Sequence, residues 1–434
     1  MFWDNYSETL DRFSLQKLQL ELLRKTIRQA QHAPYYQTIL SGAGITPESI
    51  RSLEDLRKIP FTTKDILRDH YPYGFLAVSR DDIVRMHSSS GTTGRPTVIF
   101  HTQHDIDEWS LLVARCMYMT GVRKSDVFQN MMGYGLFTGG IGFHYGAERL
   151  GAMVIPSGPG NTKRQIMLMR EFETTVIHII PSYALHLIKT LIEEGIDPKK
   201  ELKLRIAYLG AEPHSEETRR RIEDALGVRA YNSYGLSEMN GPGVAFECTE
   251  QNGMHVWEDA YILEVIDPKT LEPVKDGEEG ELVFTTLKRE GMPILRYRSK
   301  DLAAVYPEPC PCGRTHRRIT RIKGRTDDML IVKGVNMYPV QIEKTLMSFP
   351  EVGSNFLIIL DHKDYNDHMT IKVEVSSAMF TGDLKSLQNL RRTITERLRS
   401  EILITPDVQL VEPDSLPKSE GKAVRVIDNR HQWG

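Results

Sequence analysis

The sequence has few cysteines, no long hydrophobic run and no large excess of charge of one sign. Four cysteines in 434 residues are too few for a disulfide scaffold at this length, so we expect a reducing, cytoplasmic environment. No segment approaches the roughly 20 consecutive apolar residues that a membrane-spanning helix requires. Residues 1–6 lack the basic and apolar regions of a secretory signal. We therefore expect neither a membrane protein nor a secreted one.

The charge balance and the length also limit the possible classes of protein. A formal net charge of -3 argues against a general nucleic-acid-binding protein, although it is compatible with a local basic patch. A hydrophobic content of 40% and a charged content of 26% are typical of a globular chain. Because the chain exceeds one ordinary domain, we expect at least two domains, each with a sizeable core.

Strand-like and helix-like segments alternate between residues 88 and 266. We expect strands at 127–131, 152–156, 176–180 and 204–209, and helices at 102–120, 139–150, 162–172, 183–194 and 215–226. An earlier amphipathic helix is expected at 14–31, and Thr62–Asp65 is typical of a capped helix start. The alternation predicts an α/β fold of parallel sheets covered by helices. Ligands of such sheets bind at the carboxyl ends of strands, where the segment Gly210–Pro213 would lie.

The pattern changes after residue 255. Short strands at 261–266, 280–285 and 303–306 predict a β-rich subdomain over 255–323, built as a distorted barrel. Residues 324–328 are a compact polar linker. Beyond it we expect a small α+β unit with a hairpin at 329–335, a helix after Pro339, strands near 356–360, 369–375 and 423–427, and a helix at 384–403. The predicted domains are therefore 1–325 and 326–434.

A polar loop, Ser88–Pro96, lies between two strand-like segments. It is rich in hydroxyl side chains and contains two glycines and one arginine. The backbone N–H groups of such a turn can form a nest for an anion such as a triphosphate, and the hydroxyls add donors. It is not a Walker loop, because no Gly-Lys-Ser/Thr sequence closes it. Taken alone, the local composition of the loop favours a polar hairpin over an anion-binding loop.

Further polar segments follow in the chain. Tyr231–Glu238 offers an aromatic ring, a glycine, a hydroxyl and a carboxylate, which are the groups that bind a nucleotide with Mg²⁺. Asp301 offers a carboxylate for ribose hydroxyls, Arg325 lies at the domain boundary, and Lys422 lies on a glycine turn. Each residue alone also fits a structural role: Tyr234 in the core, Asp301 in a turn and Lys422 as a solvated charge.

Taken in order, these segments resemble the adenylate-forming enzymes, the superfamily of acyl-CoA synthetases, adenylation domains and luciferases. The resemblance extends from about residue 60 to the end of the sequence. Ser89–Pro96 resembles the phosphate loop, and Tyr234–Glu238 resembles the second core motif with Ser237 in place of threonine. Within the superfamily, the segments 134–140, 144–148 and 241–245 resemble those of phenylacetate–CoA ligases.

The resemblance implies a role for each matching residue. The implied catalytic residues are Lys422, Glu238 and Ser237, with Glu238 as the Mg²⁺ ligand; the implied phosphate-binding residues are Ser89, Ser90, Gly91, Thr92, Thr93, Gly94 and Arg95. The implied nucleotide-binding residues are Gly210, Ala211, Glu212, Pro213, Asn232, Ser233, Tyr234, Gly235, Asp301 and Arg325, and the implied hinge is Asp327. Two positions depart from the family pattern: Arg95 replaces lysine, and Ser299-Lys300 replaces Thr-Gly before Asp301.

The resemblance also implies a reaction. ATP and Mg²⁺ would activate an aryl acid, most simply phenylacetate, to an acyl-adenylate, and coenzyme A would then accept the acyl group with release of AMP. The C-terminal domain would rotate about Asp327 between the two steps, and the protein would form a homodimer. A ligase for another aromatic acid, an adenylyltransferase acting on a cofactor hydroxyl, and a non-catalytic nucleotide-binding regulator are alternatives. The presence of Glu238, Asp301, Arg325 and Lys422 together argues against the regulator.

The acid pocket is less specific in the sequence. Tyr134, Phe137, Ile141 and Tyr145 could enclose an aryl group, with Gly139 and Gly140 leaving room for it. Packing of the same side chains beneath the sheet is an equal alternative.

A second group of residues flanks the β-rich region. Cys248, His255, Cys310 and Cys312 are the ligand types of a structural zinc site. Unligated cysteines remain an alternative, and His316 competes with His255 as the fourth ligand. A redox pair at Cys310 and Cys312 is disfavoured because the spacing is not Cys-x-x-Cys. Cys116 lies on an expected helix and is typical of a buried thiol.

Overall fold

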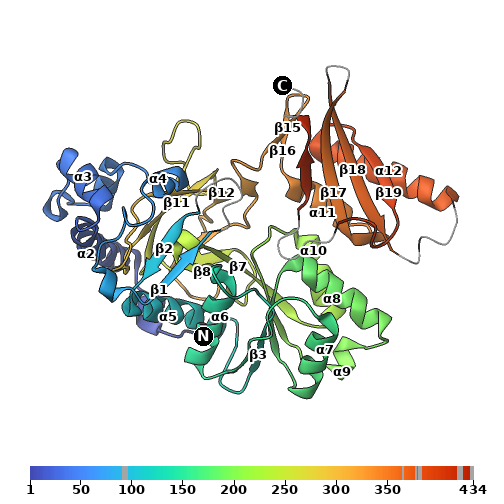
Figure 1. The fold of residues 1–434 in the computed structure, drawn as a ribbon, viewed down its shortest axis with the longest axis horizontal. Helices are drawn as coiled ribbons and strands as arrows, with labels where there is room; N and C mark the ends of the chain where they lie inside the picture. The colour runs from blue at the N-terminus through green and yellow to red at the C-terminus, as the bar shows by residue number, and fades with distance from the viewer. Residues whose placement is uncertain (90–95, 364–365, 377–378, 380–383, 418–423, 431–434) are drawn as a thin grey trace. The chain divides into compact units, whose positions relative to one another are not determined.

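The chain forms two compact units in the computed structural model (Figure 1). The first comprises residues 1–159, 174–178 and 231–322, and the second comprises residues 160–173, 179–230 and 323–434. The structure describes residues 1–89, 96–363, 366–376, 379, 384–417 and 424–430. The predicted domains 1–325 and 326–434 stay a prediction.

Helices precede the first strand of the first unit. They are α1 (Asn5–Glu8), α2 (Arg12–Ala30), α3 (Pro34–Gly42) and α4 (Lys64–Asp69), with 3₁₀ turns η1 (Pro47–Ser49), η2 (Leu53–Lys58) and η3 (Arg80–Asp82). The predicted helix at 14–31 is confirmed as α2, which begins after Asp11, whose side chain accepts from the Ser14 N–H. Thr63 caps α4 in the same way by accepting from the Ile66 N–H, as its sequence predicted.

A two-stranded hairpin flanks the polar loop. β1 (Arg85–Ser88) pairs antiparallel with β2 (Val98–His101), and Ser88 lies opposite Val98. The predicted strands on both sides of the loop are therefore confirmed.

The largest sheet has eight strands in the order β13-β9-β8-β7-β6-β5-β3-β4. Their bounds are β3 (Val127–Asn130), β4 (Met153–Ile155), β5 (Val176–Ile179), β6 (Ile206–Leu209), β7 (Arg229–Leu236), β8 (Gly241–Glu247), β9 (Met254–Val256) and β13 (Arg318–Ile319). β3 pairs parallel with β4 and β5, whereas β8 pairs antiparallel with β7 and β9. Helices α5 (Gln103–Met119) and α6 (Thr138–Leu150) pack on each other and on β8. The predicted α/β fold is confirmed.

A second sheet of the first unit lies in the predicted β-rich region. β10 (Tyr261–Ile266), β11 (Glu279–Thr286) and β12 (Tyr297–Ala304) pair antiparallel. Asp301 lies within β12, so the alternative that placed it in a turn is wrong. The alternating burial of Tyr297, Ser299 and Asp301 gives the physical reason, because side chains of a strand alternate between its two faces.

The second unit contains four helices before its C-terminal part. They are α7 (Thr162–Glu171), α8 (Pro181–Glu193), α9 (Pro198–Glu201) and α10 (Glu216–Leu226), and β14 (Gly324–Arg325) follows in the chain. The hairpin of β15 (Leu330–Val332) and β16 (Val335–Met337) and helix α11 (Pro339–Met347) occur where the sequence predicted them.

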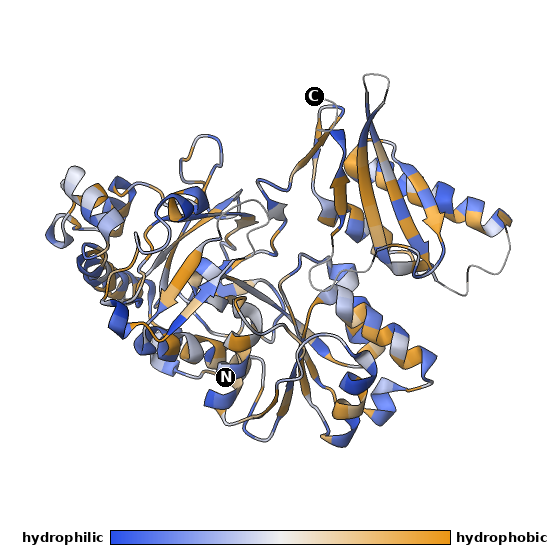
Figure 2. Cartoon of the chain, in the orientation of Figure 1, coloured by the Kyte–Doolittle hydropathy of each residue, from blue (hydrophilic) through white to orange (hydrophobic). Residues whose placement is uncertain are grey.

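The C-terminal sheet has the order β19-β18-β17-β20. It contains β17 (Val352–Lys363), β18 (Asn366–Val375), β19 (Asp407–Val411) and β20 (Val426–Asp428), and α12 (Leu384–Ile402) follows β18 in the chain. Strand β19 was not predicted. Ile342, Phe356, Ile371 and Ile394 belong to one buried core, and Figure 2 shows hydrophobic residues along these strands. No helix among the described residues is long and apolar enough to cross a membrane.

Candidate active site and a cysteine–histidine cluster

The hairpin of β1 and β2 holds the two ends of the polar loop together. The Ser89 N–H donates to the Thr97 carbonyl at 3.1 Å, and their hydroxyl oxygens lie 2.6 Å apart. The Ser88 N–H donates to the Leu136 carbonyl. The predicted phosphate-binding residues Ser90, Gly91, Thr92, Thr93, Gly94 and Arg95 lie outside the described residues.

Glu238 lies beside the base of this loop. Its carboxylate oxygen Oε1 is 3.5 Å from the Thr97 hydroxyl, and only 5% of the residue is exposed. The neighbouring Ser237 hydroxyl lies 3.3 Å from the Thr138 hydroxyl. The second motif and the phosphate-loop base are therefore neighbours in space, although 141 residues separate Thr97 from Glu238. A buried carboxylate is a suitable hard oxygen ligand for Mg²⁺ at this place.

Gly235 allows a close approach of two strands directly before Glu238. A Cβ atom at this position would lie 2.0 Å from the Gly241 carbonyl oxygen. The register of β7 and β8 shifts between Tyr234 and Gly235, and the chain then enters the 3₁₀ turn η4 (Ser237–Met239). The glycine thus fixes the path by which the chain reaches Glu238.

Tyr234 and Asp301 form a buried hydrogen bond. The Tyr234 hydroxyl donates to Asp301 Oδ2 at 2.6 Å. Ser299 holds this part of β12, because its hydroxyl accepts from the Asp301 N–H at 3.0 Å and donates to the Leu282 carbonyl at 2.8 Å. Lys300 adopts φ of +65°, the left-handed region that glycine adopts readily. Lys300 therefore adopts the backbone conformation that the glycine of the family's Thr-Gly pattern would adopt readily.

Other predicted nucleotide-binding residues lie in the second unit. Gly210, Ala211, Glu212 and Pro213 follow β6, and Ala211 has φ of +66°. Glu212 accepts hydrogen bonds from the hydroxyl of Ser182 at 2.8 Å and from its N–H at 3.1 Å. This carboxylate therefore stabilises the N-terminus of α8, where the helix dipole favours negative charge.

The predicted hinge and one ribose contact also lie in the second unit. Arg325 Nε and Nη2 donate to the two carboxylate oxygens of Asp327 at 2.9 and 3.2 Å. Lys422 lies outside the described residues. In the first unit, the Asn232 N–H donates to Glu247 Oε2 at 2.7 Å and Ser233 lies opposite Phe246 in β8.

The predicted acid-pocket residues gather at the N-terminal end of α6. The Tyr134 hydroxyl accepts from Asn130 Nδ2 at 2.9 Å and lies 3.2 Å from His144 Nδ1, and burial raises its pKa to about 12. The Tyr145 hydroxyl accepts from Arg85 Nη2 at 2.6 Å. Both tyrosines thus have polar partners.

The remaining pocket residues differ in burial. Phe137 is 36% exposed, Ile141 is half-buried and Gly139 is buried. A Cβ atom on Gly140 would lie 2.5 Å from the Gly133 carbonyl oxygen. Gly140 is therefore needed for the close packing of α6 against the preceding loop.

Sequence reasoning missed two polar residues beside the predicted acid-pocket residues. Asn130 ends β3, and its Nδ2 donates to the Gly140 carbonyl at 2.7 Å, while its Oδ1 lies 3.2 Å from His178 Nδ1. Burial lowers the pKa of His178 to about 3, so the imidazole is neutral and its Nδ1–H donates to Asn130. Both residues lie at the carboxyl ends of parallel strands, which is the signal that could have identified them.

The four predicted metal ligands of the first unit form one cluster. The Sγ atoms of Cys248, Cys310 and Cys312 and a ring nitrogen of His255 all lie within 4.8 Å of one another. The Sγ atoms of Cys248 and Cys310 are 3.7 Å apart, and Cys312 Sγ lies 3.3 Å from His255 Nε2. His255 Nδ1 donates to the His316 carbonyl at 3.0 Å, which leaves Nε2 to face the sulfurs.

The alternative ligand His316 points elsewhere. Its Nδ1 accepts from the Glu258 N–H at 2.9 Å, and its Nε2 donates to the Ser7 carbonyl at 2.8 Å. Cys116 lies outside the cluster and accepts from Trp257 Nε1 at 3.2 Å. Burial raises the pKa of Cys116 to about 12, so this thiol stays protonated.

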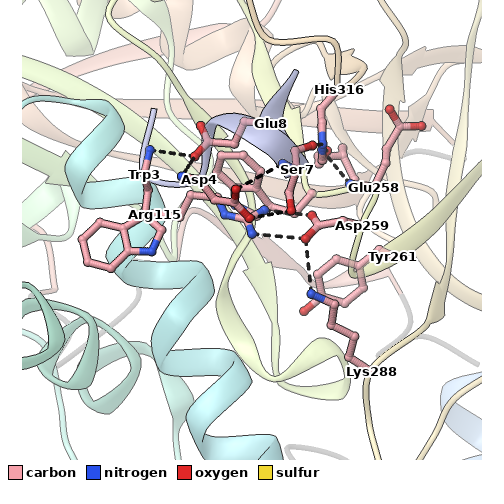
Figure 3. A network of polar contacts seen from close by, with 12 residues as sticks. Trp3, Asp4, Ser7, Glu8, Arg115, Glu258, Asp259, Tyr261, Lys288 and His316 are labelled. Atoms are coloured by element: carbon pink, nitrogen blue, oxygen red, sulfur yellow. Dashed lines mark hydrogen bonds and ion pairs between the residues drawn. The ribbon is translucent and has the colours of Figure 1, made fainter. Parts of the chain in front are cut away.

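A buried polar network includes residues of α1, Arg115, Glu258, Asp259 and His316 (Figure 3). Arg115 donates to both carboxylate oxygens of Asp259 at 2.8 and 3.1 Å, and Lys288 Nζ lies 3.3 Å from Asp259 Oδ2. Burial alone would raise the pKa of Glu258, but the cations of Arg317 and Arg12 lower it to about 2. The buried carboxylates are therefore paired with cations, as burial requires.

Comparison with known proteins relates this arrangement to a family. Residues 28–287 match the AMP-binding enzyme family, and residues 334–430 match the AMP-binding enzyme C-terminal domain. The chain is 44% identical to a phenylacetate-coenzyme A ligase of Thermus thermophilus, with 99% of this chain and 100% of the relative covered. It is 42% identical to the phenylacetate-coenzyme A ligase of Escherichia coli, with 98% of each chain covered.

A solved structure shows the same fold. The structure of a 2-hydroxyisobutyryl-CoA ligase in complex with its acyl-AMP has a TM-score of 0.94 at 29% identity, and the match covers all of this chain and 93% of the other. The chain therefore belongs to the AMP-binding enzyme family, within which it groups with the phenylacetate–coenzyme A ligases.

Proposed function

We propose that this protein activates phenylacetate with ATP to the acyl-adenylate and transfers the acyl group to coenzyme A. The observation that supports this most directly is the buried Glu238 carboxylate beside Thr97 at the base of the phosphate loop. The full-length similarity to phenylacetate-coenzyme A ligases favours phenylacetate over other acids. A ligase for a different aromatic acid is the nearest alternative.

The chemistry follows from the leaving groups. A free carboxylate is a poor acyl donor because its leaving group would be an oxide. Attack of the carboxylate on the α-phosphate of ATP forms an acyl-adenylate and releases pyrophosphate, and the thiol of coenzyme A then displaces AMP. Lys422 would supply positive charge between the substrate carboxylate and the α-phosphate, where negative charge is rearranged.

Glu238, Ser237 and the phosphate loop would position the triphosphate. The Glu238 carboxylate would hold Mg²⁺, which neutralises phosphate charge during transfer. The hydroxyl of Ser89 already lies against Thr97, so the loop residues 89–95 would present their N–H and hydroxyl donors from a fixed base. Positioning of this kind favours in-line attack.

The resemblance also supports roles for the predicted nucleotide-binding residues. We propose that Asp301 and Arg325 bind the ribose and that Gly210–Pro213 and Asn232–Gly235 surround the remaining nucleoside. The Arg325–Asp327 ion pair marks the proposed hinge, about which residues 326–434 would rotate to remove Lys422 after adenylation.

The acid would bind beside the N-terminal end of α6. The polar partners of Tyr134 and Tyr145 engage their hydroxyl groups, and the Arg85 guanidinium lies over the Tyr145 ring. The remaining ring surface, together with Phe137 and Ile141, would contact the aryl group. This arrangement supports an aromatic acid as the substrate.

The substitution Lys422→Ala tests whether Lys422 acts in adenylate formation and not in thioester formation. We expect it to nearly abolish adenylate formation from acid and ATP while sparing thioester formation from preformed acyl-AMP. Equal loss of both steps would contradict the assignment. ATP–pyrophosphate exchange across a panel of acids identifies the substrate, and exchange with none of them would favour a nucleotide-binding regulator.

A structural zinc ion is a second proposal for the cluster of Cys248, His255, Cys310 and Cys312. Three thiolates and one imidazole form a closed donor set of the kind that zinc prefers, and the His255–His316 hydrogen bond fixes the ring as outer partners of zinc ligands do. Metal analysis of purified protein should find one zinc per chain. Cys310→Ser should lose the metal and Cys116→Ser should retain it; retention by both would contradict the site.

The resemblance further supports a cytoplasmic homodimer. Size-exclusion chromatography with light scattering should give twice the 49.6 kDa chain mass, and the mass of one chain would contradict the dimer.

A further inference from the structure

Arg289 lies buried beneath the turn that carries Glu238. Its guanidinium Nη1 donates to the Glu238 carbonyl oxygen at 2.6 Å, and only 5% of the residue is exposed. The Tyr261 hydroxyl donates to the next carbonyl, that of Met239, at 2.9 Å. Two side chains from the neighbouring sheet region therefore hold the backbone of η4.

Asp105, at the start of α5, fixes the segment that carries Arg289. Its Oδ1 accepts from the Glu290 N–H at 2.8 Å, and its Oδ2 accepts from the Gly291 N–H at 3.0 Å. A Cβ atom on Gly291 would lie 2.8 Å from Asp105 Oδ2, so this approach requires glycine. The N-terminus of α5, the 289–291 segment and the Glu238 turn are thus joined in one chain of hydrogen bonds.

Arg289 also lines a small cavity. Nε and Nη2 have no hydrogen-bond partner within the described part of the chain, and the same holds for Asn240 Oδ1. A cavity of about 10 Å³ is lined by Arg289, Asn240 and Tyr261, among others. That volume admits about one water molecule, which can accept from Arg289 and donate to Asn240.

The buried charge of Arg289 interacts with Asp105 and Glu238. Burial of a cation is unfavourable unless carboxylates face it, and Asp105 and Glu238 are the carboxylates that stabilise the charged form here. Burial lowers the pKa of Arg289, and these two carboxylates oppose that shift.

We propose that Arg289 is a positioning residue for Mg²⁺–ATP: it fixes the backbone of η4 and so holds the Glu238 carboxylate at the phosphate-loop base. This inference rests on the proposed role of Glu238 as the Mg²⁺ ligand. Arg289 itself touches neither substrate nor metal.

The test is the Mg²⁺ dependence of phenylacetate-dependent ATP–pyrophosphate exchange by the full-length enzyme. Arg289→Met should raise the Mg²⁺ concentration for half-maximal exchange by about tenfold, the low end of the effect of losing an outer-sphere orienting group. The KM for phenylacetate should change less than about twofold, because Arg289 holds the Glu238 turn and not the α6 residues proposed to bind the acid. Arg289→Lys, which keeps the charge, should recover part of the Mg²⁺ affinity.

Lys288→Met is the matched control, because Lys288 lines the same cavity but pairs with Asp259 and Glu108. It should leave the Mg²⁺ dependence unchanged. An unchanged Mg²⁺ dependence in Arg289→Met, or an equal change in Lys288→Met, would overturn the proposal. If Arg289→Met does not fold, the same comparison is made with Arg289→Lys. A Mg²⁺ dependence of Arg289→Lys equal to that of the wild type would then contradict the proposal.

Glu238→Gln separates this inference from the proposed function. An unchanged Mg²⁺ dependence in Glu238→Gln would refute Glu238 as the ligand, whatever Arg289 does. If Glu238→Gln weakens Mg²⁺ binding, Arg289→Met should add little in that background. Full additivity of the two effects would show that Arg289 acts independently of Glu238.

Discussion

Glu8, in the first helix, forms a buried ion pair with Arg314, which lies 306 residues further along the chain. The Arg314 Nε–Glu8 Oε2 distance is 2.7 Å, and the two side chains are 2% and 0% exposed. Arg314 follows Cys312 by two residues, and Nη2 of Arg314 also donates to the Met1 carbonyl at 2.6 Å. The N-terminal segment is therefore bound to the loop that carries Cys310 and Cys312.

Breaking this pair should destabilise the fold strongly. Arg314→Met leaves the buried Glu8 carboxylate without its cation, which costs about 3 kcal/mol of unfolding free energy. Urea denaturation measures the loss. The exposed Arg28–Glu48 pair, with an N–O distance of 3.5 Å, is the matched control, and Arg28→Met should cost less than about 1 kcal/mol. Similar losses in the two variants would contradict the difference in burial.

Removal of the proposed zinc should loosen the same N-terminal segment. The loop 310–316 supplies two cluster residues and also the Thr315 N–H, which donates to the Glu8 carbonyl at 3.2 Å. We expect chelator-treated protein to be cleaved by trypsin after Arg12 faster than the zinc-loaded protein, with cleavage after Arg28 unchanged. Equal acceleration at both sites would indicate general unfolding instead.

Tyr234→Phe should weaken ATP binding more than acid binding. The substitution removes the 2.6 Å hydrogen bond to Asp301 and with it one restraint on the orientation of that carboxylate. A hydrogen bond to a charged group contributes about 1.5–3 kcal/mol, so the KM for ATP should rise about tenfold or more. The KM for phenylacetate should remain near the wild-type value. An equal rise in both would show that Tyr234 acts on the whole fold.

Gly235→Ala should displace Glu238 through a clash between two strands of the backbone. The added Cβ would meet the Gly241 carbonyl at 2.0 Å, so β7 and β8 must separate just before η4. We expect exchange activity to fall at least about tenfold, the scale of effect that a small displacement of a reacting group produces. Gly42→Ala is the control, since a Cβ there meets nothing within 4 Å. Wild-type activity in Gly235→Ala would contradict this account.

The sequence predicted the alternating strands and helices and most of the motif positions, because both depend on local patterns. Helices such as α2 and α12 carry hydrophobic residues at helical spacing, and the glycine and hydroxyl residues before Glu238 match the family pattern locally. Strand β19 was missed because Asp407–Val411 is short and pairs with β18 at a distance in the chain. Its strand character depends on that partner rather than on its own residues.

The supporting residues of the site could not be predicted for a related reason. Arg289 is an ordinary arginine in the sequence, and its contact with Glu238 exists only because β11 and β7 are folded into place. Asn130 and His178 follow the rule for parallel strand ends, but which of them contacts Tyr134 depends on the register of β3 and β5. The Cys–His cluster was predictable because its residue types are rare and specific.

His178 gives the chain a distinct pH dependence of stability. The ring centroids of His178 and Phe143 lie 3.9 Å apart. Burial lowers the pKa of His178 to about 3, from about 6.5 in the unfolded chain. Between these values the unfolded state binds a proton that the folded state does not. Stability should therefore fall as the pH decreases from 6.5 toward 3, by about 1.4 kcal/mol per pH unit from this residue alone.

His178→Gln should remove that contribution. The wild type also contains His87 and His101, whose pKa values burial lowers, so its total slope includes their protons as well. The difference in unfolding free energy between the wild type and His178→Gln isolates the contribution of this residue. Between pH 7.5 and pH 5.5, this difference should change by about 1.4 kcal/mol in favour of the variant. Urea denaturation at the two pH values measures it, with the exposed His32→Gln as the control for loss of an imidazole. A difference that does not change with pH would mean that His178 is protonated in the folded protein, and its Nδ1–H donation to Asn130 would then have to be reassigned.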